Sequence, residues 1–88
     1  MEIKNYLEIV VQDVVEKELS SKDEPWAKSE KSRLDIMAFI LNRLPARYVV
    51  TDKGWIMTKI KETEVQFQVD ILREMVKAIE VVKKNPRI

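Results

Sequence analysis

The sequence predicts a mainly α-helical fold, with three principal helices and a short β-hairpin between the second and the third. Apolar residues recur every three or four positions through most of the 88-residue chain, which is the period of an amphipathic helix. The chain has one glycine and three prolines, and it combines 45% hydrophobic with 35% charged residues. This composition is typical of a helix-rich globular protein, and the length is sufficient for one domain.

The first predicted helix spans residues 2 to about 20. A polar segment follows at residues 20–25, where Pro25 is incompatible with a continuing helical turn. The apolar positions of this helix lie three or four residues apart with charged residues between them, so one face is expected to be buried. They are Ile3, Leu7, Val10, Val11, Val14 and Val15.

The second predicted helix starts at a serine cap, either Ser29 or Ser32, and runs to about Leu44, where Pro45 ends it. Residues 36–41 are apolar all the way round the helix. A helix of this kind has to be covered on several sides, by its own chain or by a second copy. One face carries Leu34, Met37, Ala38, Leu41 and Leu44.

The β-hairpin is predicted from two short runs of β-favouring residues, at 48–51 and 55–60. Gly54 lies between these runs and can adopt the positive φ that a tight turn needs. Thr63 and Gln66 then resemble a capping box, which opens a long third helix that is expected to end at about Lys84.

The third predicted helix carries two adjoining apolar stripes. So wide an apolar surface in a short chain suggests burial against another chain, and we therefore expect a homodimer. One stripe consists of Val65, Val69, Leu72, Val76 and Ile79, and the other of Phe67, Ile71, Met75, Ala78 and Val82.

The chain contains neither cysteine nor histidine. Disulfides, thiolate metal sites and cysteine nucleophiles are therefore excluded, and the commonest general base is missing. Gly54 stands alone, so the sequence has no glycine-rich phosphate loop. We expect no enzyme activity and no cofactor.

Charged residues interrupt the first twenty positions, so no signal peptide is expected. The longest unbroken apolar run, residues 36–41, has six residues, whereas a membrane span needs about 20. We therefore expect a cytoplasmic protein that does not enter a membrane.

Charge is unevenly distributed, although the net charge is only +1. Residues 1–24 hold three basic and seven acidic side chains, whereas residues 25–61 hold eight basic and three acidic ones. The basic middle segment would attract an anion; alternatively, the acidic first helix neutralises it within the fold or across a dimer. Duplex DNA is not the expected ligand, because the pI of 7.9 lies below the value of about 9 that is common among DNA-binding domains.

Polar and charged side chains gather at both ends of the second predicted helix, within positions 33–48. Arg33, Arg43 and Arg47 are candidates for binding an anion. Asp35 and Asn42 are costly to bury without hydrogen bonds, which leaves two interpretations open. In the first, Asn42 caps the helix exit and Asp35 pairs with an arginine. In the second, both residues support a binding site.

The same region contains a run of residues that resembles a known signature. The run consists of Arg33-Leu34-Asp35, Ala38, Leu41-Asn42-Arg43-Leu44-Pro45, Arg47-Tyr48-Val49-Val50-Thr51 and Lys53-Gly54. It closely resembles the signature of the late-competence ComFB family, strongly over positions 27–60 and by pattern alone in the flanking helices. The resemblance implies one ComFB-like domain over residues 1–88 and a small, helical, dimeric, non-enzymatic cytoplasmic protein of bacteria.

The resemblance also implies a function. The family name comes from an operon linked to DNA uptake, and some members are reported to bind cyclic dinucleotides and to influence pili and motility. A second-messenger receptor is therefore the function that the resemblance implies.

One departure from the family concerns zinc. Many relatives carry Cys-x-Cys-x-x-Cys as part of a zinc site immediately before the Arg-Leu-Asp run. This chain has Ala27, Ser29 and Ser32 at those places, so zinc is not expected.

A cyclic dinucleotide presents two phosphates and two purines around a two-fold axis, which a homodimer can match with identical half-sites. Arginine and lysine side chains would contact the phosphates, and a tyrosine ring or the plane of an arginine would stack on a base. The expected contact residues are Arg33, Arg43, Arg47, Tyr48 and Lys53, with Asp35 and Asn42 holding the arginines in place.

The competing hypothesis is a dimeric protein–protein interaction module without a nucleotide ligand. In that case the apolar second and third helices form the dimer, and the basic middle segment docks an unidentified acidic protein.

Overall fold

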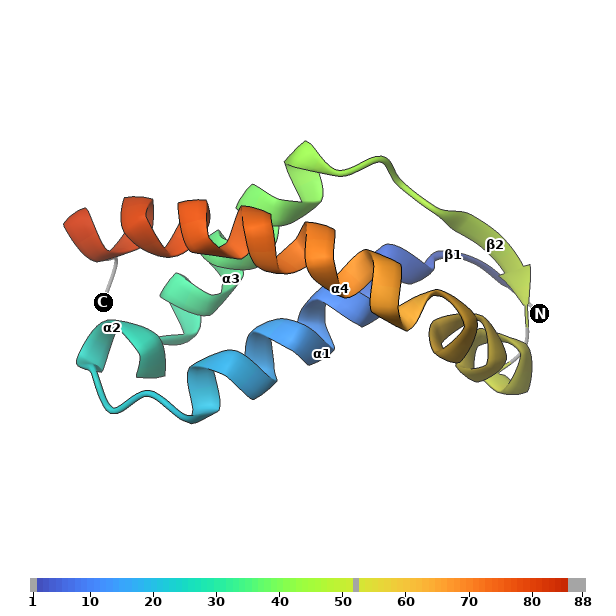
Figure 1. The fold of residues 1–88 in the computed structure, drawn as a ribbon, viewed down its shortest axis with the longest axis horizontal. Coiled ribbons are helices and arrows are strands. Elements are labelled where there is room, and N and C mark those ends of the chain that lie inside the picture. The colour runs from blue at the N-terminus through green and yellow to red at the C-terminus, as the bar shows by residue number, and fades with distance from the viewer. Residues whose placement is uncertain (1, 52, 86–88) are drawn as a thin grey trace.

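The computed structural model describes the backbone of residues 2–51 and 53–85 and the side chains of residues 2–50 and 68–85. Four helices and two short strands lie in this part of the chain (Figure 1). The molecule is elongated, with extents of 39 × 22 × 22 Å. In order, the elements are β1 (Glu2–Asn5), α1 (Tyr6–Ser20), α2 (Pro25–Lys28), α3 (Glu30–Arg43), β2 (Tyr48–Thr51) and α4 (Lys53–Lys84).

The first helix is shorter than its apolar pattern predicts, because residues 2–5 form strand β1. Helix α1 begins at Tyr6, and Asn5 is its N-cap: the Asn5 Oδ1 atom accepts a hydrogen bond from the N–H of Leu7 at 3.3 Å. A capping asparagine has an extended backbone, so it allows the strand to turn directly into the helix. The predicted end near residue 20 is confirmed.

The predicted β-hairpin is wrong, although residues 48–51 do form a strand. This strand, β2, pairs antiparallel with β1, so that Ile3 lies opposite Val50 and Asn5 opposite Tyr48. Residues 55–60 belong to the first turns of α4, which begins at Lys53. Intrinsic strand preference is a weak prior that tertiary context often overrides, and a partner more than forty residues away leaves no local signal.

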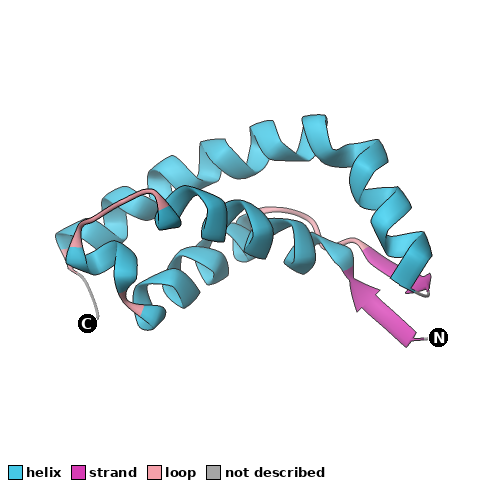
Figure 2. Ribbon diagram, turned by 90° about the horizontal axis from the view of Figure 1, so that it is seen from below, coloured by secondary structure: helices cyan, strands magenta, loops and turns pink. Residues whose placement is uncertain are grey.

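The third predicted helix therefore starts about ten residues too late. The start near Thr63 is wrong because α4 is already helical from Lys53, and the end at Lys84 is confirmed. Figure 2 shows this long helix curving over the other helices, with its first turns beside the two strands.

Ser29, and not Ser32, caps the second principal helix. The Ser29 Oγ atom accepts a hydrogen bond from the N–H of Ser32 at 3.3 Å, and Ser32 itself is fully buried. Pro25 starts the additional short helix α2, a position that its fixed φ favours. The predicted stop of α3 before Pro45 is confirmed, since α3 ends at Arg43.

The core lies between α1, α3 and α4. The fully buried residues of α3 in this core are Ile36 and Ile40. The predicted Leu34 to Leu44 face contributes in part: Met37, Leu41 and Leu44 are half-buried against the core. Leu34, which is 55% exposed, and Ala38 lie outside it. The apolar pattern of this helix runs all the way round, so periodicity could not separate the two sides. The core side chains are Tyr6, Leu7, Val10, Val11, Val14, Val15, Leu19, Trp26, Ala27, Ile36, Ile40, Ile71, Met75, Ala78 and Val82.

One of the two apolar stripes of helix α4 is buried in this core, and Ile79 of the other stripe packs against it. The described residues of the buried stripe are Ile71, Met75, Ala78 and Val82. In the other stripe Ile79 is half-buried, and Val69, Leu72 and Val76 are exposed. We call these last four residues the outer stripe of α4.

A cluster of polar contacts joins α2 to the end of α4. The indole N–H of Trp26 donates a 2.6 Å hydrogen bond to Glu24 Oε2, and the Lys83 Nζ atom lies 3.7 Å from the same oxygen. Lys83 Nζ also lies 5.9 Å from the centroid of the Trp26 ring. We call Glu24, Trp26 and Lys83 the α2 clasp.

Truncation of the α3 core face should destabilise the protein. Ile36→Ala is expected to lower the free energy of unfolding by about 2 to 5 kcal/mol, because it leaves a cavity in a packed core. Leu34→Ala, two residues away on the exposed side, is the control and should change it by about 0.5 kcal/mol or less. Urea unfolding followed by circular dichroism measures both variants. Equal losses would contradict the assignment of the core face.

The α2 clasp should make stability depend on pH in acid. The Trp26 hydrogen bond lowers the pKa of Glu24 below its ordinary value of 4.5, and the charges of Lys83 and Lys22 lower this pKa further. The carboxylate therefore contributes its full stabilisation above pH 4.5 and loses it as the pH falls below that value. Between about pH 5 and pH 3, the free energy of unfolding should fall less steeply in Glu24→Gln than in the wild type. Denaturant titrations at each pH measure the free energy of unfolding of both proteins. An equally steep fall in Glu24→Gln and in the wild type would refute the prediction.

Candidate functional site

The predicted ligand-binding residues are divided between the two ends of α3 and the start of β2. Arg33 and Asp35 lie in the first two turns of α3, and Arg43 is its last residue. Ten residues of helix separate Arg33 from Arg43, which corresponds to about 15 Å along the helix axis. The structure therefore does not bring these two guanidinium groups of one chain together.

Arg43 lies between an aromatic ring and a carboxylate. The Arg43 Cζ atom is 4.1 Å from the centroid of the Phe39 ring, one turn earlier on α3. The Arg43 Nε atom lies 4.0 Å from Glu74 Oε2 on α4, and the Arg43 side chain is still 51% exposed. Arg43 is thus held on two sides while half of it remains accessible to an anion.

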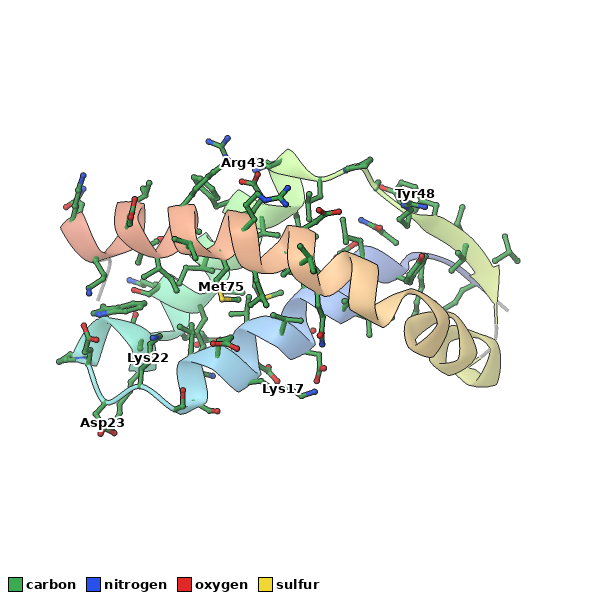
Figure 3. All side chains as sticks on the ribbon, viewed as in Figure 1. Lys17, Lys22, Asp23, Arg43, Tyr48 and Met75 are labelled. Carbon is green, nitrogen blue, oxygen red and sulfur yellow. The ribbon has the colours of Figure 1, made fainter. Side chains whose placement is uncertain are left out.

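Arg47 and Tyr48 are presented by a backbone that is fixed to the start of α1. The Arg47 N–H donates to Asn5 Oδ1 at 2.8 Å, and the Arg47 carbonyl accepts from the N–H of Tyr6 at 2.9 Å. Arg47 is exposed, and Tyr48 is 68% exposed. Figure 3 shows Arg43 and Tyr48 along the same edge of the molecule. We call residues 43–48 the α3–β2 connection.

Three other predicted residues lie outside this connection. Asp35 is half-buried and Asn42 is exposed. The N–H of Leu44 donates to the carbonyl of Ile40 at 3.2 Å, so the main chain closes this end of α3 and Asn42 stays accessible. Lys53 is the first residue of α4, and its side chain lies outside the described residues.

Arg33 faces a different environment from Arg43. It lines a cavity of about 250 Å³ between α1 and α3, together with Glu16 and Glu30. Its Nε atom is buried and has no hydrogen-bond partner in the described part of the chain. Two carboxylates at the same cavity oppose the approach of a phosphate, so Arg33 is a poorer phosphate ligand than Arg43 or Arg47.

A second cavity, of about 380 Å³, lies beside Tyr48. Its lining includes Ile3 and Lys4 of β1 and Glu8 of α1, and it shares Gln12 with the Arg33 cavity. The lining of this cavity therefore combines an apolar side chain, a positive charge and a negative charge. The cavity therefore offers space for a flat polar ring next to the exposed Tyr48 ring.

Ala27, Ser29 and Ser32 stand where the family resemblance would place zinc-binding cysteines, and none of them is a usual zinc ligand. Ala27 and Ser32 are fully buried, and Ser29 is used as the cap of α3. Among the side chains that the structure describes, residues 2–50 and 68–85, no group of three or more carboxylates could hold a metal ion. The residues present do not fit a thiolate zinc site, since the chain contains no cysteine.

Sequence reasoning did not identify Glu74, which lies against Arg43. Its side chain is only 15% exposed, and its neighbour Met75 belongs to the buried stripe of α4. A carboxylate at the border of an apolar stripe requires a partner, and this is the signal that the sequence contains. The identity of the partner depends on how α3 packs against α4.

None of the helices in the described ranges combines the length and the apolar content that crossing a membrane requires.

Known proteins resemble this chain in sequence and in fold. The family model described as "Late competence development protein ComFB" matches residues 4–86. The solved structure of the late competence protein ComFB from Bacillus subtilis is similar, with a TM-score of 0.78 and 22% sequence identity, over 98% of this chain and 93% of that one. No curated protein sequence matches. Because the family model spans nearly the whole chain, this protein belongs to the ComFB family of late competence development proteins.

Proposed function

We propose that this ComFB-family protein is a dimeric, non-enzymatic receptor for a cyclic dinucleotide, which acts in competence, pili or motility. One observation carries the proposal: the α3–β2 connection presents two accessible arginines and an exposed tyrosine on a backbone that is anchored at Asn5 and Tyr6. A preformed recognition segment of this kind loses little conformational entropy on binding.

The chemistry of the connection suits a nucleotide. Arg43 and Arg47 offer planar guanidinium groups to phosphate oxygens. The exposed ring of Tyr48 stacks on a purine, a contact worth about 1 to 3 kcal/mol in single-strand complexes. Lys53 adds positive charge at the start of α4, and Asn42 stands next to Arg43 at the end of α3. Asp35 lies near Arg33 in the first turns of α3.

Arg33 is not part of the proposed half-site. It lies at the far end of α3 from Arg43, in a cavity with two glutamates. The half-site of one subunit therefore consists of the α3–β2 connection and the adjacent cavity beside Tyr48, without Arg33.

The outer stripe of α4 supports the dimer. Val69, Leu72, Val76 and Ile79 follow one another at intervals of three, four and three residues, which is the spacing of a two-helix seam. Three of these side chains are exposed in the single chain. Covering them with the same stripe of a second copy removes apolar surface from water on both partners.

The second candidate function is an interaction module without a nucleotide ligand. It is favoured by the separation of Arg33 from Arg43, and by the Glu74 carboxylate that already faces Arg43. A thermal-shift screen with cyclic di-GMP, cyclic di-AMP and their linear forms separates the two functions, because a ligand that binds the folded state raises the melting temperature. No shift with either cyclic compound would favour the interaction module.

The outer stripe of α4 is expected to be the dimer interface. Val76→Asp should give a folded monomer in sedimentation at micromolar concentration, because it places a charge in an apolar seam. Val81→Asp is the matched control: Val81 is 56% exposed, close to the 61% of Val76, but lies about 140° away around the helix. Dimers of equal stability in both variants would rule out this interface.

Arg47→Ala should weaken cyclic dinucleotide binding at least about tenfold, because it removes one charge-assisted phosphate contact. The dimer should persist, since the Arg47 backbone contacts are retained. Arg73→Ala is the control: this arginine is also exposed, but it pairs with Asp70 on α4. Titration calorimetry measures both variants. Binding heats for Arg47→Ala that match those of the wild type would remove Arg47 from the site.

A further inference from the structure

We infer that Glu74 is a positioning residue for Arg43: it holds the guanidinium group in the orientation in which that group meets a ligand phosphate. The inference rests on the proposed function and adds to it a residue of α4, outside the α3–β2 connection.

Burial makes Glu74 dependent on Arg43. The side chain of Glu74 is 15% exposed, and its Oε2 atom is buried without a hydrogen bond in the described part of the chain. A buried carboxylate oxygen that accepts no hydrogen bond is costly unless a positive charge compensates it. The Arg43 Nε atom lies 4.0 Å from this oxygen and supplies that charge.

The second oxygen of Glu74 is held from its own helix. Lys77 Nζ lies 3.4 Å from Glu74 Oε1, one turn further along α4. This contact orients the carboxylate so that Oε2 points across to α3. The Oε2 atom of Glu74 therefore attracts the guanidinium group of Arg43 towards α4.

The position of Arg43 leaves most of its donors available. The Phe39 ring covers one face of the guanidinium group, and the Nε side faces Glu74. An arginine has five N–H donors, of which only one is on Nε. The two terminal nitrogens carry the other four donors, and an anion can reach them because the side chain is 51% exposed.

The arrangement has a direct consequence for affinity. Without Glu74, Arg43 keeps the Phe39 contact and is free to sample more rotamers, whose loss on binding costs free energy. With Glu74, the guanidinium group is already restricted before the phosphate arrives. Glu74 therefore strengthens phosphate binding, although its own charge has the same sign as the ligand.

The test is titration calorimetry of Glu74→Gln with the cyclic dinucleotide that gives the largest thermal shift with the wild type. Glutamine keeps the shape of the side chain and removes the charge, so binding should weaken about tenfold. Glu74→Asp keeps the charge and should recover part of the affinity. Glu80→Gln, an exposed glutamate on the same helix, is the matched control and should bind as the wild type does.

A double-mutant cycle separates positioning from a general effect on the fold. In the Arg43→Ala background, Glu74→Gln should cause no further loss, because the residue that it positions is gone. An equal loss in both backgrounds would overturn the inference, and so would affinity that is unchanged or higher in Glu74→Gln alone. If Glu74→Gln does not fold, Glu74→Asp takes its place in the same cycle, with a smaller loss expected.

The wild-type titration distinguishes this inference from the function on which it rests. If the wild type binds a cyclic dinucleotide and the Glu74 variants bind it equally well, the receptor function stands and the positioning role is wrong. If the wild type binds neither cyclic compound, the receptor function fails and the role of Glu74 fails with it.

Discussion

One side-chain oxygen connects the two halves of this fold. Asn5 Oδ1 accepts hydrogen bonds from the N–H of Leu7, at the start of α1, and from the N–H of Arg47, 42 positions further along the chain. A two-stranded sheet is marginal by itself, so the pairing of β1 with β2 depends on contacts of this kind. The same Asn5 side chain therefore caps α1 and fixes the backbone of the candidate site at Arg47.

Helix α4 links this arrangement to the rest of the molecule. Its buried stripe completes the core, its end is held by the α2 clasp, and Glu74 extends from it towards the end of α3. Since the outer stripe lies on the same helix as Glu74, the proposed dimer contact and the residue proposed to position Arg43 both belong to α4. Dimer formation and ligand binding would then both depend on the position of α4.

The sequence predicted those features that have a local cause. Pro25, Pro45 and Asn85-Pro86 are signals a few residues beyond the ends of α1, α3 and α4, and those ends agree with the predictions. Ser29, one of the two predicted caps, starts α3. Strand β1 has no such signal, because the residues around Ile3 fit a helical pattern until their partner is known. The prediction of a β-hairpin failed for a related reason. Gly54 indicates a turn only if residues 55–60 form a strand, and these residues belong to α4.

The same distinction applies to the candidate site. The arginines and Tyr48 stand in a compact run and could be found from the sequence, including their resemblance to the ComFB signature. The division of these arginines between two environments could not be predicted from the sequence. It depends on which face of α3 packs against α1 and which packs against α4. Glu74 was missed since it lies more than thirty residues away from Arg43, and only packing brings the two together.

The main-chain anchoring of Arg47 separates recognition from folding. Asn5 and Tyr6 hold this residue through its N–H and its carbonyl, which every amino acid except proline provides. Evolution can therefore exchange the side chain at position 47, and with it the chemistry shown to solvent, while the scaffold remains intact. Related proteins could in this way diverge in what they recognise without first having to diverge in shape.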